Sequence, residues 1–241
     1  RHAPECDRMV EAFARAALPL FVAYYRRCLP RFLEVRRIIA ADGIGQVTGV
    51  RYAAAAAKHT EAAAWRVDAA RAGGGHFLDV GSHVLDLLDF LFGPLQAVAG
   101  SAAHSGGPTA VEDLVALAFT TGSGVPGAAS WNFAAAVPED RLVISGMAGQ
   151  LSLSVFGADP ILWETKAGIS QIDKPHPPHV AQPLIQAVVD DLLGLTPCPS
   201  TGESARRTSR VMDAVLDTYY GGRSDKFWAR PETWPGRKTT G

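Results

Sequence analysis

Two helical patterns flank a continuous apolar run near the start of the chain. Pro4–Ala17 and Pro30–Ala41 repeat hydrophobic residues at helical spacing, and Pro19 stops the first helix. The expected inward residues are Met9, Val10, Phe13 and Ala17 in the first helix, and Phe32, Val35, Ile38 and Ile39 in the second. Between them, Leu20–Tyr25 is apolar at every position, which is typical of a strand covered on both faces of a parallel sheet.

A buried parallel strand needs neighbouring strands, and no second unit of this helix-then-strand kind follows in the chain. We therefore interpret the opening residues as the last αβ unit of a domain whose earlier part is missing. The alternative is an edge strand in a mixed sheet.

Beyond the glycines at 43 and 45 the pattern predicts a strand, a helix and then a succession of strands. The expected elements are strand Gln46–Ala57, helix Asp79–Phe92, and strands Leu95–His104, Asp113–Thr121, Val125–Phe133, Arg141–Met147, Gln150–Val155 and Ile161–Thr165. Thr121–Gly124 and Ala148–Gly149 are turn signals of the hairpin type. Because consecutive strands joined by short turns pair antiparallel, the pattern predicts an α+β fold.

Two more helices are expected near the end of the chain. Apolar residues from Val180 to Leu193 form a helical stripe, and Ser200–Glu203 has the spacing of a capping box before the last helix. Gly221 and the glycine after it should end that helix. The tail, Arg223–Gly241, is rich in proline and tryptophan and is expected to lie over the surface as irregular chain.

Composition and charge narrow the function classes. Apolar residues make up 47% of the chain and charged residues 20%, which excludes disordered and coiled-coil proteins. The formal net charge is −1, so neither a nucleic acid nor an anionic membrane is an expected partner. The longest apolar run, Ala16–Tyr25, is too short to span a bilayer. Three scattered cysteines suit a reducing compartment, and we expect a cytoplasmic protein.

The stretch most suited to chemistry opens the predicted helix at Asp79. Asp79, His83 and Asp86 share one helix face, directly after the glycine-rich Gly73–Gly75. The apolar residues of this helix share another face, which is expected to point inward: Val80, Val84, Leu87, Leu88 and Leu91. A carboxylate one turn before an imidazole can hold it in one tautomer and favour its protonated form, which is useful in general acid–base catalysis. The glycines would let the backbone approach a ligand closely.

Other interpretations of the same residues stay open. Asp79 could act only as a helix cap, His83 could be an ordinary core or surface histidine, and Gly73–Gly75 could be a plain loop. His76, Asp79 and His83 could also present three ligands to a metal ion, as in a metal-dependent hydrolase, although no specific ligand motif such as H-E-x-x-H is present. We therefore predict no metal.

Several blocks together resemble the glucose–fructose oxidoreductase / inositol dehydrogenase (Gfo/Idh/MocA) family. They are Asp79-x-x-x-His83 behind its glycine-rich loop, Trp65-Arg66 upstream, Val22–Arg27 followed by Leu29–Phe32, and the ending from Cys198–Ser204 to Tyr219–Arg223. The sequence departs from the family pattern in its N-terminal part. Gly43–Thr48 begins like a dinucleotide-binding fingerprint, but it ends in threonine and follows a helix, so no pyrophosphate-binding loop is visible.

The resemblance implies two domains. Residues 1–28 would be the remnant of a truncated Rossmann domain, and residues 29–241 an α+β substrate-binding and dimerisation domain. That second domain would have a large open, mostly antiparallel sheet with helices on one face. The cofactor would be NAD or NADP, with its binding site largely in the missing N-terminal part.

The resemblance also assigns roles to individual residues. His83 would be the acid/base at the reacting carbinol, and Asp79 would orient it or hold a substrate hydroxyl. Trp65, Arg66 and His76 would line a sugar or polyol pocket, with Tyr24 and Arg26 beside the nicotinamide. We thus expect the substrate domain of an NAD(P)-dependent oxidoreductase, inactive as this isolated chain. The alternative is a non-catalytic assembly module, since family members pair as homo-oligomers through the open sheet face.

Overall fold

The fold is built on one large sheet. The computed structural model describes residues 1–56, 64–106, 109–224 and 226–237. Its strands are β1 (Val47–Ala55), β2 (Gln96–Ala103), β3 (Leu114–Thr120), β4 (Pro126–Asn132), β5 (Glu139–Gly146), β6 (Gly149–Leu153), β7 (Ile161–Thr165) and β8 (Gly168–Ile172). These described strands form one eight-stranded sheet in the order β2-β3-β4-β1-β5-β6-β7-β8. Only β1 and β4 pair in parallel among them, so the predicted α+β class with a mostly antiparallel sheet is confirmed.

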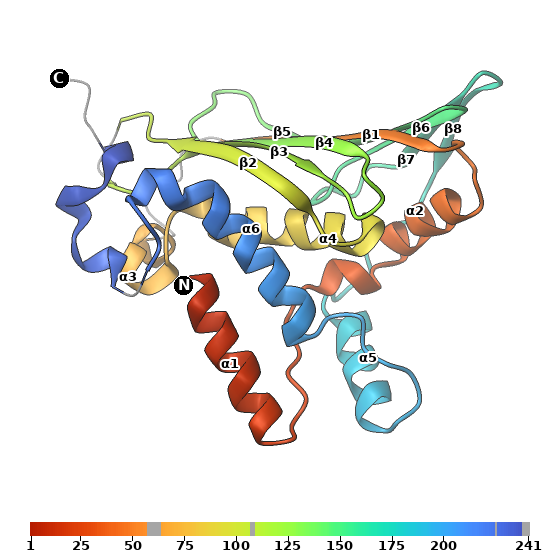
Figure 1. The fold of residues 1–241 in the computed structure, drawn as a ribbon. Helices are drawn as coiled ribbons and strands as arrows, with labels where there is room; N and C mark the ends of the chain where they lie inside the picture. The colour runs from red at the N-terminus through yellow and green to blue at the C-terminus, as the bar shows by residue number, and fades with distance from the viewer. Residues whose placement is uncertain (57–63, 107–108, 225, 238–241) are drawn as a thin grey trace.

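Helices cover one face of this sheet. They are α1 (Ala3–Arg15), α2 (Pro30–Ala40), α3 (Ala69–Ala72), α4 (Ser82–Phe92), α5 (Gln182–Leu192) and α6 (Gly202–Tyr220), and the shorter turns are η1 (Tyr25–Cys28), η2 (Ala64–Val67), η3 (Phe77–Gly81), η4 (Phe227–Ala229), η5 (Pro231–Thr233) and η6 (Pro235–Arg237). Figure 1 shows α2, α4 and α6 lying along one face, while α1 and α5 extend away from the sheet. The other face carries no helix in the described part of the chain, as predicted.

The core lies between the sheet and the inward faces of α2, α4 and α6. Phe32, Val35 and Ile38 of α2 are buried, and so are Val84, Leu87 and Leu88 of α4, as the helical pattern predicts. Burying each such side chain stabilises the fold by about 1.5–3 kcal/mol, so these two helices are fixed against the sheet. None of the described helices combines the length and apolar character that crossing a bilayer requires.

The expected strand at Leu20–Tyr25 is not formed, and that prediction is wrong. Phe21 makes a single bridge to Thr201, and Tyr25 already starts the turn η1. A ladder needs repeated backbone pairs, but this segment is joined to the stretch 200–202 by just two backbone hydrogen bonds, between Val22 and Ser200 and between Gly202 and Leu20. The stripe expected in the first helix is also partly wrong, because Met9 and Phe13 of α1 are exposed.

The C-terminal third departs from the sequence-based expectation in three places. The edge strand β8 was not expected, and the apolar stripe of α5 leaves only Leu184 buried within that helix. The capping box is shifted by one residue: Thr201 caps α6 and pairs reciprocally with Ser204, because the Ser200 hydroxyl donates to the Val22 carbonyl instead. Gly221 ends α6 in the left-handed conformation, as predicted.

The tail follows the surface in short turns, but two of its side chains join the core. Phe227 and Trp234 are buried and pack their rings on Tyr220 at centroid distances of 4.9 and 4.6 Å. The expectation of a purely superficial tail is therefore wrong at these two residues. Ala57, which ends the expected strand Gln46–Ala57, and residues 238–241 lie outside the described residues.

Candidate active site

The segment that carries the predicted catalytic residues begins with a widened turn. Phe77–Gly81 forms the π-type turn η3, which runs directly into α4. A Cβ at Gly81 would overlap the ring of Phe77, so glycine allows this buried ring to lie against the turn. Turns of this kind recur at functional sites because they re-aim the side chains around them. Asp79 lies within the turn and His83 just after it.

Asp79 is bonded to Arg66 rather than to His83. The Arg66 Nε donates to the Asp79 carboxylate at 2.6 Å, and both side chains are about 40% exposed. The Arg66 guanidinium in turn lies over the Trp65 ring, 4.5 Å from its centroid. The structure thus brings three of the predicted site residues into one connected, solvent-accessible group.

His83 is enclosed by aromatic rings. The rings of Tyr24 and Tyr25 each lie 5.4 Å from the imidazole, centroid to centroid. Its Nδ1 is buried and has no hydrogen-bond partner among the described residues. Burial lowers the pKa of His83 to about 4, with a further contribution from the positive charge of Arg26, while Asp79 acts in the opposite direction.

The charge state of His83 therefore differs from the expectation. Asp79 favours the protonated imidazole, as the sequence suggested, but burial outweighs it, and His83 is neutral near pH 7. Asp86, expected on the same face, is fully buried and accepts two hydrogen bonds from Arg27, at 2.7 and 2.8 Å. It is part of the core and not of the site.

Tyr24 packs its ring on His83, and Arg26 follows two residues later in the turn η1. Burial raises the pKa of Tyr24, so its hydroxyl keeps its proton. Arg26 is only 4% exposed; its guanidinium lies 4.8 Å from the Tyr25 centroid and 4.1 Å from that of Phe156. One of its terminal nitrogens, Nη1, has no hydrogen-bond partner within the described structure.

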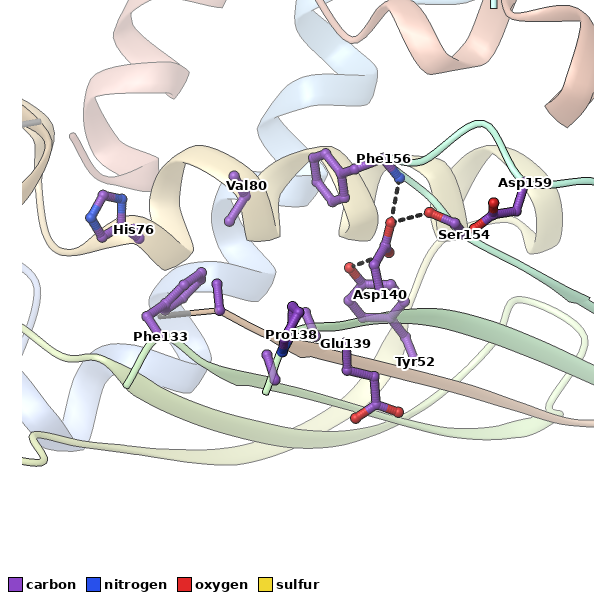
Figure 2. Close-up of a pocket in the computed structure, with 13 residues that line it drawn as sticks. Tyr52, His76, Val80, Phe133, Pro138, Glu139, Asp140, Ser154, Phe156 and Asp159 are labelled. Atoms are coloured by element: carbon purple, nitrogen blue, oxygen red, sulfur yellow. Dashed lines mark hydrogen bonds between the residues drawn. The ribbon is translucent and has the colours of Figure 1, made fainter. Parts of the chain in front are cut away.

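A cavity of about 420 Å³ opens beside this cluster. Its walls come from the end of β1, the turn η3, and the segments that flank β5 and β6, including Tyr52, His76, Val80, Phe133, Asp140 and Phe156. Figure 2 shows His76 and Val80 on the helical side of the cavity and Asp140 on the strand side. Among the described residues that line the cavity, His76 is the one that was predicted as a site residue. Its ring lies 5.6 Å from the ring of Phe133, centroid to centroid.

Asp140 organises the strand side of the cavity, and sequence reasoning missed it. Its carboxylate accepts hydrogen bonds from the Tyr52 hydroxyl at 3.0 Å, from the Ser154 hydroxyl, and from the amides of residues 155–157 at 2.6–3.3 Å (Figure 2). Burial, together with the negative charge of Asp140, raises the pKa of Tyr52, which therefore stays a donor. A signal existed: the hairpin register that pairs Leu142 with Leu153 also brings Asp140 next to Val155.

The glycine-rich loop packs against a buried carboxylate, that of Glu112. The Gly75 amide donates to both carboxylate oxygens of Glu112 at 3.0 Å, and a Cβ there would overlap the Glu112 backbone. Glu112 is buried and also accepts from the Tyr220 hydroxyl. The expectation that these glycines make room for a ligand is wrong for Gly75, because the space is taken by this carboxylate.

The histidines and Asp79 do not form a metal centre in the described structure. No group of three or more histidine, cysteine, aspartate or glutamate side chains lies close enough to hold a metal ion among the residues described. The interpretation of His76, Asp79 and His83 as three ligands therefore finds no support in their geometry.

Comparison with known proteins gives a consistent picture. Residues 32–152 match the family model described as the GFO/IDH/MocA C-terminal domain. Over 219 residues, the chain is 27% identical to the oxidoreductase P35 of Formosa agariphila, which corresponds to 89% of this chain and 67% of that protein.

Solved structures share the fold. An aldose-aldose oxidoreductase from Caulobacter crescentus, complexed with glycerol, has a TM-score of 0.77 at 19% identity, over 88% of this chain and 65% of that one. A levoglucosan dehydrogenase in complex with NADH and levoglucosan has a TM-score of 0.79 at 17% identity, over 90% and 68% of the two chains. An oxidoreductase from Agrobacterium radiobacter in complex with NAD+, L-tartaric acid and magnesium has a TM-score of 0.75 at 16% identity, over 89% and 67%. The chain spans about two thirds of the length of these relatives.

Proposed function

Because this chain belongs to the Gfo/Idh/MocA family of oxidoreductases, we propose that it is the substrate-binding part of an NAD(P)-dependent enzyme. Its substrate would be a sugar, a polyol or a related hydroxy or keto compound. The observation that carries the proposal is the enclosed, neutral imidazole of His83, which lies one turn from an exposed Asp79–Arg66 pair and near a cavity of about 420 Å³.

His83 would move the proton of the substrate hydroxyl. With a pKa of about 4, roughly one His83 in a thousand carries a proton at pH 7, so the resting imidazole is in the unprotonated form that a general base needs. General base catalysis of this kind contributes about 10²–10⁴ in rate.

Asp79 and Arg66 would bind substrate hydroxyls. The carboxylate accepts one hydrogen bond from Arg66 Nε and has oxygen lone pairs left to accept others, while the guanidinium has further N–H donors. Both groups are accessible, and Trp65 beside them offers an exposed ring surface. A sugar, which both donates and accepts at each hydroxyl, suits such a mixed pair.

Residues 1–241 would contribute to the cofactor site only at the nicotinamide end of the dinucleotide. Tyr24 offers an aromatic surface, and Arg26 Nη1 and His83 Nδ1 are buried polar atoms without a hydrogen-bond partner in the described part of the chain. A bound nicotinamide would supply the hydride exchange with the substrate carbon. For the phosphates, Gly43–Thr48 joins α2 to β1 and so lacks the strand-to-helix geometry of a pyrophosphate cradle. We expect the rest of the dinucleotide to be bound outside residues 1–241.

The test replaces His83 in protein that also contains a dinucleotide-binding part. His83→Ala should lower kcat by about 10²–10⁴ with NAD+ or NADP+ and a sugar or polyol panel. The matched control is His179→Ala, which removes an exposed imidazole elsewhere and should leave kcat unchanged. Unchanged turnover of His83→Ala would refute the assigned role. Steady-state NAD(P)H oxidation by residues 1–241 alone would contradict the expected division of the cofactor site.

The open sheet face would pair with a second copy of this chain. Its exposed side chains on β3 and β4 are small, including Ala116, Ala118, Ala128 and Ser130, so another backbone can approach closely. Ala128→Arg should then shift sedimentation from dimer to monomer; a monomeric unmodified chain would exclude this partner. A dimer that shows no turnover in the longer protein would favour the alternative of a non-catalytic assembly module.

A further inference from the structure

The loop between β6 and β7, residues 154–159, is held by charged side chains of other segments. Besides the hydrogen bonds that the loop amides donate to Asp140, the buried Arg31 donates to the carbonyls of Gly157 and Asp159 at 2.8 and 2.9 Å. Arg26 Nε donates to the Val155 carbonyl at 3.3 Å. A surface loop whose backbone groups are satisfied by three charged side chains has one fixed conformation.

This fixed loop presents an aromatic ring to the cavity. Phe156 lines the cavity and is 38% exposed, although large apolar side chains are usually buried. The Arg26 guanidinium lies over the ring at 4.1 Å, which fixes its tilt. Figure 2 shows the ring extending from the loop on the side of Val80.

The remaining wall adds a second apolar surface. Phe133 and Val80 line the same cavity, while the Asp140 carboxylate is already occupied by donors from the protein. A pyranose ring has a polar rim of hydroxyls and an apolar face of C–H groups. An exposed, fixed aromatic ring fits that apolar face, whereas a flexible open-chain polyol has no such flat face to offer.

We propose that Phe156 is a specificity-determining residue that stacks on the C–H face of a cyclic sugar. Asp140 is a positioning residue that holds the ring in place through the amides of residues 155–157. The inference rests on the proposed function of this cavity and narrows its substrate class to ring forms over open-chain polyols.

The experiment measures ligand binding by residues 1–241 with NMR titration. The probes are the methyl pyranosides of glucose, galactose, mannose and xylose, each compared with the corresponding open-chain alditol. For whichever pyranoside binds, Phe156→Ala should weaken its affinity about three- to tenfold and change that of the alditol less than about twofold. Phe156→Tyr should keep the pyranoside affinity. The matched control is Met147→Ala, which removes an exposed apolar side chain on the β5–β6 turn and should change neither.

A double-variant cycle tests the positioning role of Asp140. Asp140→Asn should weaken pyranoside binding in the unmodified chain and have no further effect in the Phe156→Ala background, because its influence acts through the ring. Additive losses would assign Asp140 a separate role. Equal losses for pyranoside and alditol, or no loss with Phe156→Ala, would overturn the stacking inference and leave the proposed function standing. No binding of any pyranoside to the unmodified chain would also overturn the stacking inference, whereas the proposed function is tested separately by turnover in the longer protein.

Discussion

The ionisation of His83 should respond in opposite directions to substitutions at two neighbouring charges. Its pKa of about 4, against an ordinary value of 6.5, corresponds to about 3 kcal/mol in favour of the neutral imidazole. Arg26→Gln removes a positive charge and should raise this pKa, whereas Asp79→Asn removes a negative charge and should lower it further.

The size of the Arg26 effect follows from the geometry. Both the Arg26 guanidinium and the imidazole lie about 5 Å from the Tyr25 ring, so the two charges are up to about 10 Å apart. At that distance and an effective dielectric constant of about 20, Coulomb's law gives about 1.7 kcal/mol, or roughly one pH unit. Arg26→Gln should therefore move the pKa of His83 to about 5, and the rest of the shift should persist because it comes from burial.

The measurement is an NMR titration of the imidazole carbon resonances, which needs neither cofactor nor substrate. His83→Gln identifies the resonance by removing it, and amide spectra at each pH confirm that the fold is retained. A midpoint near 6.5 in the unmodified chain would refute the enclosed, neutral imidazole. A higher pKa in Asp79→Asn, or a lower one in Arg26→Gln, would refute the assignment of the two charges.

Three further predictions concern stability and are measured by urea unfolding. Because the folded pKa of His83 lies below its unfolded value, the unfolded chain binds more protons than the folded chain between pH 6.5 and about 4. The unmodified chain should therefore lose about 3 kcal/mol of unfolding free energy relative to His83→Gln as the pH falls through this window. Parallel pH profiles of the two proteins would contradict this. Arg27→Met leaves the buried Asp86 carboxylate without its arginine, while Asp89 keeps its pair with Arg207, and it should cost about 3–5 kcal/mol. Arg37→Met, which removes an exposed ion pair, should change the stability little; equal effects would exclude a special role for the buried network. Gly75→Ala should lower the free energy of unfolding by about 1–3 kcal/mol, because the added Cβ has no space. Gly49→Ala should be tolerated, because no atom lies within 4 Å of a Cβ added there. The reverse order would refute the close packing of the loop.

Local patterns predicted those parts of the fold that depend on local contacts. The inward faces of α2 and α4 and the hairpins at Thr121–Gly124 and Ala148–Gly149 are confirmed because periodicity and turn chemistry act within a few residues. The edge strand β8 was missed because it is short and mostly exposed, and so shows no alternation of buried and exposed residues. The position of β1 between β4 and β5 is set by pairing with segments far along the chain, which no local pattern reveals.

The family resemblance is confirmed by the match over residues 32–152, and the candidate site was partly predicted with it. Spacing alone brought His76, Asp79 and His83 to attention because they lie within one short segment. It could not predict that Asp79 bonds to Arg66, since that contact depends on how η2 folds back against η3. Asp140 and Phe156 were missed because their importance arises from the register of a hairpin and from the conformation of a loop.

The central place of β1 has a consequence for the order of folding events. The strands β2–β4 and β5–β8 form two meanders whose partners are close in sequence, and each can assemble by itself in the early stages. β1 joins them: Val50 pairs with both Gly127 and Ile144. Closing these long loops is slow, so we expect the docking of β1 to limit the folding rate. Since the end of β1 forms one wall of the cavity, refolding experiments should find secondary structure restored before the cavity and the sugar binding proposed for it.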